Sequence, residues 1–218
     1  MVRMTPDRRR AAIVAAALAV ARRKGLATTT VRDVAAEMGT SSGLVHHYFG
    51  SMDDVLAAAF ELLAAEDLRL TAASMAGARD PAEALARFFR AYAPAEADPA
   101  FQLWLDAWSE AARRPAIQAT SRRLNLAWHS LLEDTIRTGV TSGRFRCADP
   151  PAAAWRILSL VDGLALQVVA HGTTITRQDA FAWAAASSER ELGLRAGALG
   201  VPAEGRRAGP GMQAGPSA

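Results

Sequence analysis

The sequence contains a single cysteine, Cys147, among its 218 residues. One cysteine cannot form an intrachain disulfide and cannot by itself make a zinc site, so the fold has to be stabilised by its core. We therefore expect a protein of the reducing cytoplasm.

Residue patterns that support enzyme chemistry are missing as well. The sequence has no glycine-rich phosphate loop, no metal-ligand spacing and no G-x-S-x-G motif, and its four histidines are scattered. We predict no catalytic residues, no metal and no cofactor, which makes an all-α enzyme the least favoured function.

The apolar run at residues 11–21 follows three arginines, as in a signal peptide, but it is short. A helix needs about 20 residues to cross a bilayer. The run ends in Arg22, Arg23 and Lys24 rather than at a small-residue cleavage site. It therefore predicts an ordinary helix, and we expect no membrane partner.

The alternation typical of β-strands is also absent, whereas apolar residues recur every three or four positions. A hydroxyl residue stands three positions before a carboxylate at Thr30, Ser51 and Thr176, which resembles a helix capping box. The sequence predicts an all-α fold of about nine helices, over residues 5–24, 30–38, 42–48, 51–76, 80–94, 99–112, 115–141, 149–171 and 177–194.

Positive charge is concentrated in the first 50 residues, which hold eight arginines and lysines against three acids. This segment carries a net charge of +5, while the whole chain carries +3. A basic amino-terminal part on a slightly acidic body indicates an anionic partner, although charge alone would also serve solubility.

The stretch from Thr29 to Ser51 has the layout of a helix-turn-helix. A short helix ends at Gly39, which permits a turn with positive φ, and a second short helix begins at Ser42. Small polar residues at the start of the second helix allow its close approach to a DNA groove and to phosphate.

These motifs resemble the TetR family of transcriptional regulators, through the short helix ending in A-x-x-x-G and the H-Y-F sequence at residues 47–49. The sequences S-G-L-V-x-H-Y-F, L-W-L-D-A-W-S-E-A and D-G-L-A-L-Q are similar to the branch typified by the choline-responsive repressor of betaine synthesis. The resemblance implies a helix-turn-helix domain at residues 1–50 and a ligand-binding and dimerisation domain at 51–196, joined by the helix 51–76. Residues 197–218 are glycine-rich and predict a disordered tail.

The resemblance and the helix-turn-helix layout together predict contacts to an operator in double-stranded DNA. Arg32, His47 and Tyr48 are expected to meet phosphate, and Ser42 and Leu44 are candidates for base contact. The predicted DNA-binding residues are Thr30, Arg32, Thr40, Ser41, Ser42, Gly43, Leu44, His46, His47, Tyr48 and Ser51.

All five tryptophans lie in the carboxy-terminal part, where they form either a ligand pocket or an ordinary core. Carboxylates near the aromatic rings favour a pocket for a cationic amine, because ring faces attract ammonium groups. The side chain of Asp162 could instead pair with Arg123 or Arg156. The predicted ligand-binding residues are Phe101, Trp104, Trp108, Trp128, His129, Asp162 and Gln167.

The last two predicted helices carry apolar or small-residue stripes that would let two subunits approach closely. In the family that the sequence resembles, these helices form the homodimer interface. The predicted interface residues are Leu158, Val161, Ala165, Val168, Phe181, Ala184, Ala185 and Ser188.

The sequence therefore predicts a homodimeric, ligand-responsive repressor that a small molecule releases from a palindromic operator. A DNA-binding protein without a ligand is the alternative, and activation in place of repression stays open.

Overall fold

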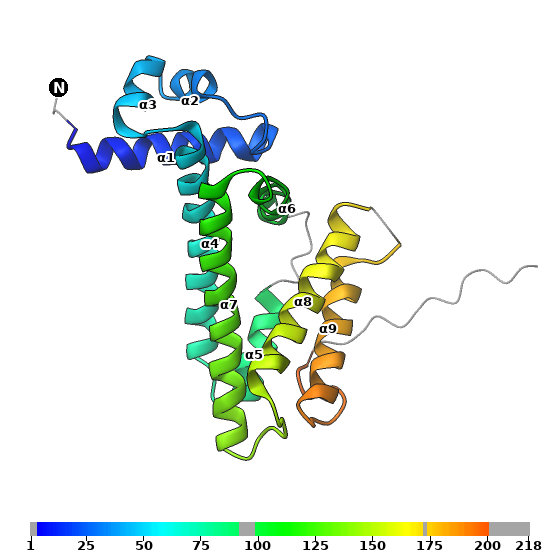
Figure 1. Ribbon diagram of the computed structural model, residues 1–218. Helices are drawn as coiled ribbons and strands as arrows, with labels where there is room; N and C mark the ends of the chain where they lie inside the picture. Colours follow the sequence, from blue (N-terminus) through cyan, green and yellow to red (C-terminus); the bar gives the residue numbers. More distant parts are fainter. Residues whose placement is uncertain (1–3, 92–98, 172–173, 201–218) are drawn as a thin grey trace, which may run out of the picture.

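The computed structural model describes residues 4–91, 99–171 and 174–200 (Figure 1). Over these residues the fold is all-α, as predicted, with nine helices and no strand. The helices are α1 (Pro6–Lys24), α2 (Val31–Glu37), α3 (Ser42–Tyr48), α4 (Met52–Ala76), α5 (Pro81–Ala91), α6 (Pro99–Ala111), α7 (Pro115–Thr141), α8 (Pro150–Val169) and α9 (Arg177–Glu191).

Local sequence signals set where the helices begin. Thr30 and Thr176 form complete capping boxes with the aspartates three residues later, and Thr5 and Asp149 accept a backbone N–H at their helix starts. These caps agree with the sequence prediction to within one or two residues. The predicted end of the fifth helix, residues 92–94, lies outside the described residues.

The helices α1, α2 and α3 gather at one end of the molecule, where α1 crosses the top of α4 (Figure 1). The long helices α4 and α7 run side by side away from this cluster. The helices α8 and α9 pair along the opposite side, and α5 packs against α4, α7 and α9. The helix α6 lies near the junction, in contact with α1, α4, α7 and α8.

Two hydrophobic cores stabilise this arrangement. The first joins α1, α2 and α3 to the upper half of α4, and it includes Leu103 and Ala107 of α6. The second lies between α5, α7, α8 and α9. The half-buried Trp104 packs against both cores. The predicted boundary between residues 50 and 51 therefore falls inside the first core, because α4 and α6 complete it.

The packed chain extends further than the sequence predicts. Leu199 is fully buried, and the carboxylate of Glu189 accepts the backbone N–H groups of Gly197 and Leu199, both at 2.9 Å. Residues 197–200 thus belong to the folded part rather than to a tail. The rest of the predicted tail, 201–218, lies outside the described residues.

Among the described helices, α8 is the one that is long and apolar enough to cross a membrane by length and composition. It packs against α7 and α9, and its residues Ala153, Ile157 and Val161 are buried in the second core. About 33% of its apolar window is buried in this way.

Close packing at the end of α7 generates a stability prediction. Gly139 is buried, and a Cβ at this position would lie 2.0 Å from Cδ2 of the Phe145 ring. We expect Gly139→Ala to lower the free energy of unfolding by about 1–3 kcal/mol, because the ring has to shift. The helix propensity of alanine offsets part of this loss, about 1 kcal/mol.

Urea denaturation measures this effect, with the neighbouring exposed Thr138→Ala as the matched control. An unchanged or higher midpoint for Gly139→Ala would mean that the Phe145 ring does not pack on α7 as described.

Candidate DNA-binding and ligand-binding sites

Packing between α2 and α3 makes the helix-turn-helix. Val34 and Ala35 on α2 and Val45 on α3 are buried in the first core. Gly39 adopts φ +62° between the helices, and the Thr40 N–H donates to the Ala35 carbonyl at 2.9 Å. The small side chain of Ala35 and the positive φ of Gly39 together permit the tight turn.

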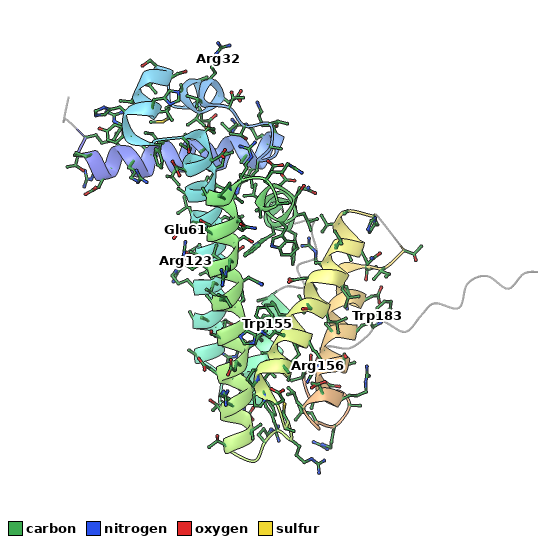
Figure 2. All side chains as sticks on the ribbon, viewed as in Figure 1. Arg32, Glu61, Arg123, Trp155, Arg156 and Trp183 are labelled. Carbon is green, nitrogen blue, oxygen red and sulfur yellow. The ribbon has the colours of Figure 1, made fainter. Side chains whose placement is uncertain are left out.

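The other residues of the turn and of α3 are exposed or half-buried at the surface. Ser41, Gly43, His46 and His47 are exposed, and Thr40, Ser42, Leu44 and Tyr48 are half-buried. Arg32 lies in the first turn of α2 and projects away from the body of the protein (Figure 2). These nine predicted residues share one end of the molecule.

The two remaining predicted DNA contacts are engaged in helix caps. The Thr30 hydroxyl donates to Asp33 Oδ2 at 2.5 Å, and the Ser51 hydroxyl donates to Asp54 Oδ2 at 2.8 Å. Their side chains therefore hold the starts of α2 and α4, and a phosphate contact would have to replace these bonds.

Part of the basic charge is also used within this module. Arg23 pairs with Glu37 at 2.5 Å, and Lys24 pairs with Asp33 at 2.7 Å, so α2 is tied to the end of α1. Hydrogen bonds from Lys24 and Thr30 lower the pKa of Asp33 to about 2. These two ion pairs engage two of the positive charges of the module.

A cavity of about 30 Å³ lies among the aromatic side chains of the second core. Trp104 and Trp108 come from α6, and their ring centres are 5.8 Å apart. Such a volume has room for little more than a water molecule or two. The lining residues are Phe88, Phe101, Trp104, Trp108, Asn125, Trp128, Leu158, Val161 and Asp162.

Asp162 is the one acidic residue of this lining. Burial raises the pKa of its carboxyl to about 7. Neither predicted arginine reaches it, because Arg123 pairs with Glu61 at 2.8 Å and Arg156 pairs with Glu191 at 2.5 Å (Figure 2). Within the described residues, no hydrogen bond or ion pair reaches the Asp162 carboxylate.

The structure brings together five of the seven predicted ligand-binding residues. His129 and Gln167 are outside the lining. The His129 ring stacks on Trp155, with 4.3 Å between ring centres, and its Nε2 lies 3.0 Å from the carbonyl oxygen of Pro151. Sequence analysis missed Phe88 and Asn125, because no sequence spacing relates α5 or the middle of α7 to the tryptophans of α6.

The predicted dimer-interface residues are largely covered within the protomer. Seven of the eight are buried inside one protomer, Val168 being half-buried, and Leu158 and Val161 line the aromatic cavity. The Ser188 hydroxyl donates to the Ala184 carbonyl at 2.8 Å within α9. Other large apolar side chains of the same helices are exposed, which are Leu166 (38%), Trp183 (45%) and Trp155 (37%), whose ring also stacks on His129.

A larger open hollow of about 420 Å³ lies between the end of α4, the start of α5 and α7. Its lining combines small and apolar residues with charged and hydroxyl residues and contains no aromatic ring; the residues are Ala72, Met75, Ala76, Ala78, Arg79, Asp80, Pro81, Ala84, Leu131, Asp134, Thr135 and Thr138. It therefore has apolar surface but none of the ring faces that attract a cation.

The helix α6 connects the aromatic cavity to the helix-turn-helix module. The Leu26 N–H, just after α1, donates to Asp106 Oδ2 at 3.2 Å. On the same helix, the indole N–H of Trp104 donates to Asp67 of α4 at 3.4 Å. The cavity and the end of α1 thus share one rigid element.

A second contact lies at the turn between α6 and α7. Arg114 donates to Asp53 in the first turn of α4 and to the buried Glu110, each at 2.6 Å. Hydrogen bonds from Arg113 and Arg114 lower the pKa of Glu110. This network fixes the carboxyl end of α6 against the helix that follows the helix-turn-helix.

In the described part of the chain, no group of three or more histidine, cysteine, aspartate or glutamate residues could hold a metal ion.

Comparisons with known proteins identify both halves of the chain. Residues 13–59 match the family described as bacterial regulatory proteins, tetR family, and residues 81–193 match the BetI-type transcriptional repressor, C-terminal domain. The HTH-type transcriptional regulator BetI of Paraburkholderia xenovorans (strain LB400) is 33% identical over 170 residues, which cover 73% of this chain and 80% of that protein. The BetI regulator of Rhizobium meliloti (strain 1021) is 31% identical over 169 residues, covering 75% and 78%.

Among solved structures, a protein from Saccharomonospora viridis in complex with choline is similar, with 26% identity and a TM-score of 0.75. The match covers 84% of this chain and 96% of that one. The helix-turn-helix, the all-α carboxy-terminal domain and these matches agree with one another. The chain belongs to the TetR family of bacterial transcriptional regulators, which are not enzymes, and its carboxy-terminal domain is of the BetI repressor type.

Proposed function

We propose that the protein is a cytoplasmic, homodimeric repressor that leaves a palindromic operator when a choline-like quaternary ammonium cation enters the aromatic cavity. The observation that carries the ligand class is Asp162, a carboxylate among aromatic side chains that has no polar partner in the described part of the chain. The similar structure from Saccharomonospora viridis, which holds choline, supports the same class.

The chemistry of the cavity suits this cation. A quaternary ammonium group has no N–H to donate, so it needs ring faces and a nearby negative charge instead of hydrogen-bond acceptors. Trp104, Trp108 and Trp128 supply the faces, and ionised Asp162 supplies the charge. Binding would also compensate the carboxylate for its desolvation, because no described residue forms a hydrogen bond or ion pair with it.

The size of the cavity links binding to movement. A space of about 30 Å³ is smaller than a quaternary ammonium group, so the tryptophan rings have to separate before the cation fits. Two of these rings belong to α6, which also bears Asp106 at the end of α1. We infer that the ligand moves α6 and so changes the placement of the helix-turn-helix.

The outward faces of α8 and α9 are the proposed dimer interface. Trp183 and Leu166 are exposed large apolar side chains on these faces, and a Cβ at Gly163 would meet nothing within 4 Å in the protomer. A twofold dimer would place two recognition helices about 34–36 Å apart, on successive major grooves. This face replaces the inward stripe that the sequence predicts.

A ligand-independent regulator is the alternative function, and the small size of the cavity favours it. In that case the tryptophans would be ordinary core, and Asp162 would be a buried acid whose raised pKa of about 7 has no role in binding. Choline binding distinguishes the two functions.

The charge of Asp162 generates a pH prediction for ligand binding. Because burial raises its pKa to about 7, the carboxylate is largely protonated at lower pH and cannot attract a cation. Choline affinity should rise with pH up to about 7 and then level off. Asp162→Asn should lower the affinity at least tenfold, about 1.4 kcal/mol, and abolish the pH dependence. Isothermal titration calorimetry between about pH 5.5 and 8.5 measures both effects.

The matched control is Asp134→Asn, which removes an acid that lines the larger hollow instead of the aromatic cavity. It should leave choline binding unchanged. Loss of binding in Asp134→Asn with retention in Asp162→Asn would place the ligand in the hollow.

The same raised pKa also affects stability. The folded protein favours the protonated carboxyl, so stability that is present at low pH is lost as the pH rises through about 7. Asp162→Asn should therefore melt at a higher temperature than the unchanged protein at pH 8, and the difference should disappear near pH 4.

The dimer face generates a separate prediction. Trp183→Glu should convert the dimer to a monomer at micromolar concentration, because the charge would be buried against the second subunit. Leu62→Glu, which changes a similarly exposed apolar side chain on α4, is the control and should stay dimeric. Sedimentation velocity measures the mass. A Trp183→Glu variant that stays dimeric would move the interface away from α9.

A further inference from the structure

The recognition helix α3 has few internal means of keeping its orientation. It has seven residues, and its N-cap Ser41 makes no side-chain capping bond. Val45 within the helix and Phe49 just after it are its main buried anchors. Helices this short are marginal without tertiary contacts. Something outside α3 has to hold its carboxyl end.

Arg10 on α1 makes that contact. Its Nη1 donates to the Tyr48 carbonyl oxygen at 2.8 Å, and its guanidinium carbon lies 4.0 Å from the centre of the Phe49 ring. The Tyr48 carbonyl belongs to the last turn of α3, where carbonyl groups lack partners within the helix. Among the described residues, this is the one hydrogen bond that joins α1 to α3.

The contact uses the shape of an arginine as well as its charge. The planar guanidinium can lie on an aromatic face while one edge donates to a carbonyl. A cation is also favourable at the carboxyl end of a helix dipole. A lysine has the charge but cannot stack on Phe49 and donate along a fixed edge.

We propose that Arg10 is a positioning residue for DNA binding, which clamps the carboxyl end of α3 to α1 and does not itself contact DNA. The clamp is adjacent to His47 and Tyr48, whose rings meet edge to face with 5.0 Å between centres. These are the residues expected to hold the phosphate backbone. The inference rests on the proposed DNA-binding surface and adds to it a residue that neither the helix-turn-helix pattern nor its exposure singles out.

Salt dependence separates a positioning role from direct contact with DNA. Removing one cation that binds a phosphate lowers the magnitude of the slope of log affinity against log salt by about 0.9. A residue that only positions its neighbours leaves the slope unchanged while those neighbours still reach the phosphates.

The experiment measures operator affinity by fluorescence anisotropy over a salt series, with a duplex selected from genomic fragments that the protein binds. The variants are Arg10→Gln and Arg10→Lys, and Arg8→Gln removes one exposed charge from the same helix as a control.

We expect Arg10→Gln and Arg10→Lys to weaken operator binding by the same factor. At one salt concentration this factor should be roughly tenfold relative to Arg8→Gln, which is the range for removing a hydrogen bond from a charged group. Arg10→Lys should keep the slope of the unchanged protein. Full rescue by lysine would overturn the proposal, because a charge that contacts phosphate does not need a planar group. Unchanged affinity in both variants would overturn it too.

A double-mutant cycle with Tyr48→Phe gives the second readout. If Arg10 acts by placing Tyr48, removing the hydroxyl should weaken operator binding less in the Arg10→Lys background than in the unchanged protein. Strictly additive effects would contradict the proposal. Circular dichroism and choline binding confirm that each variant is folded. Absence of operator binding by the unchanged protein would count against the proposed function itself, whereas binding that is indifferent to Arg10 would overturn only this inference.

Discussion

The hydrogen bond from the Leu26 N–H to Asp106 joins the helix-turn-helix module to the helix that lines the aromatic cavity. It lies where α1 ends, next to Gly25, whose φ is +85° and whose Cβ position would come within 3.0 Å of the Asp106 carboxylate. The positive φ favours glycine at this position, and a Cβ there would also press on the Asp106 carboxylate. The contact between the two halves of the protein therefore depends on the backbone conformation of Gly25 and on its lack of a side chain.

A regulator of this kind needs a ligand-induced change at one site to alter the other, and the two cores provide the mechanical basis. Trp104 packs against both cores, while Leu103 and Ala107 on the same helix are buried in the amino-terminal core. Because packed interiors resist compression, a cation that separates the tryptophans has to move α6 as a unit. Asp106 and the Arg114 to Asp53 pair would transmit that movement to the end of α1 and the start of α4.

Much of this structure could be predicted from the sequence because the signals are local. Capping residues mark the helix starts, and the spacing of four between Trp104 and Trp108 places both rings on one side of α6. The buried side of α8 could not be predicted in the same way. The helix α8 is apolar over most of its circumference, so an apolar stripe does not reveal which side meets the core. The cavity residues Phe88 and Asn125 and the clamp at Arg10 depend on tertiary neighbours, which periodicity does not specify.

Reciprocal linkage between choline and operator tests the central claim, that Asp106 couples the cavity to the DNA-binding module. In the unchanged protein, operator should weaken choline binding by the same factor, typically about 5- to 150-fold, by which choline weakens operator binding. Asp106→Ala should lower this factor to the part that the Arg114 to Asp53 pair still carries, while leaving choline affinity for the DNA-free protein unchanged. Asp106→Asn, which keeps an acceptor oxygen for Leu26, and the exposed Ser109→Ala should retain the factor. Full linkage in Asp106→Ala would contradict the account, because the signal would then have to reach the DNA-binding module by another route.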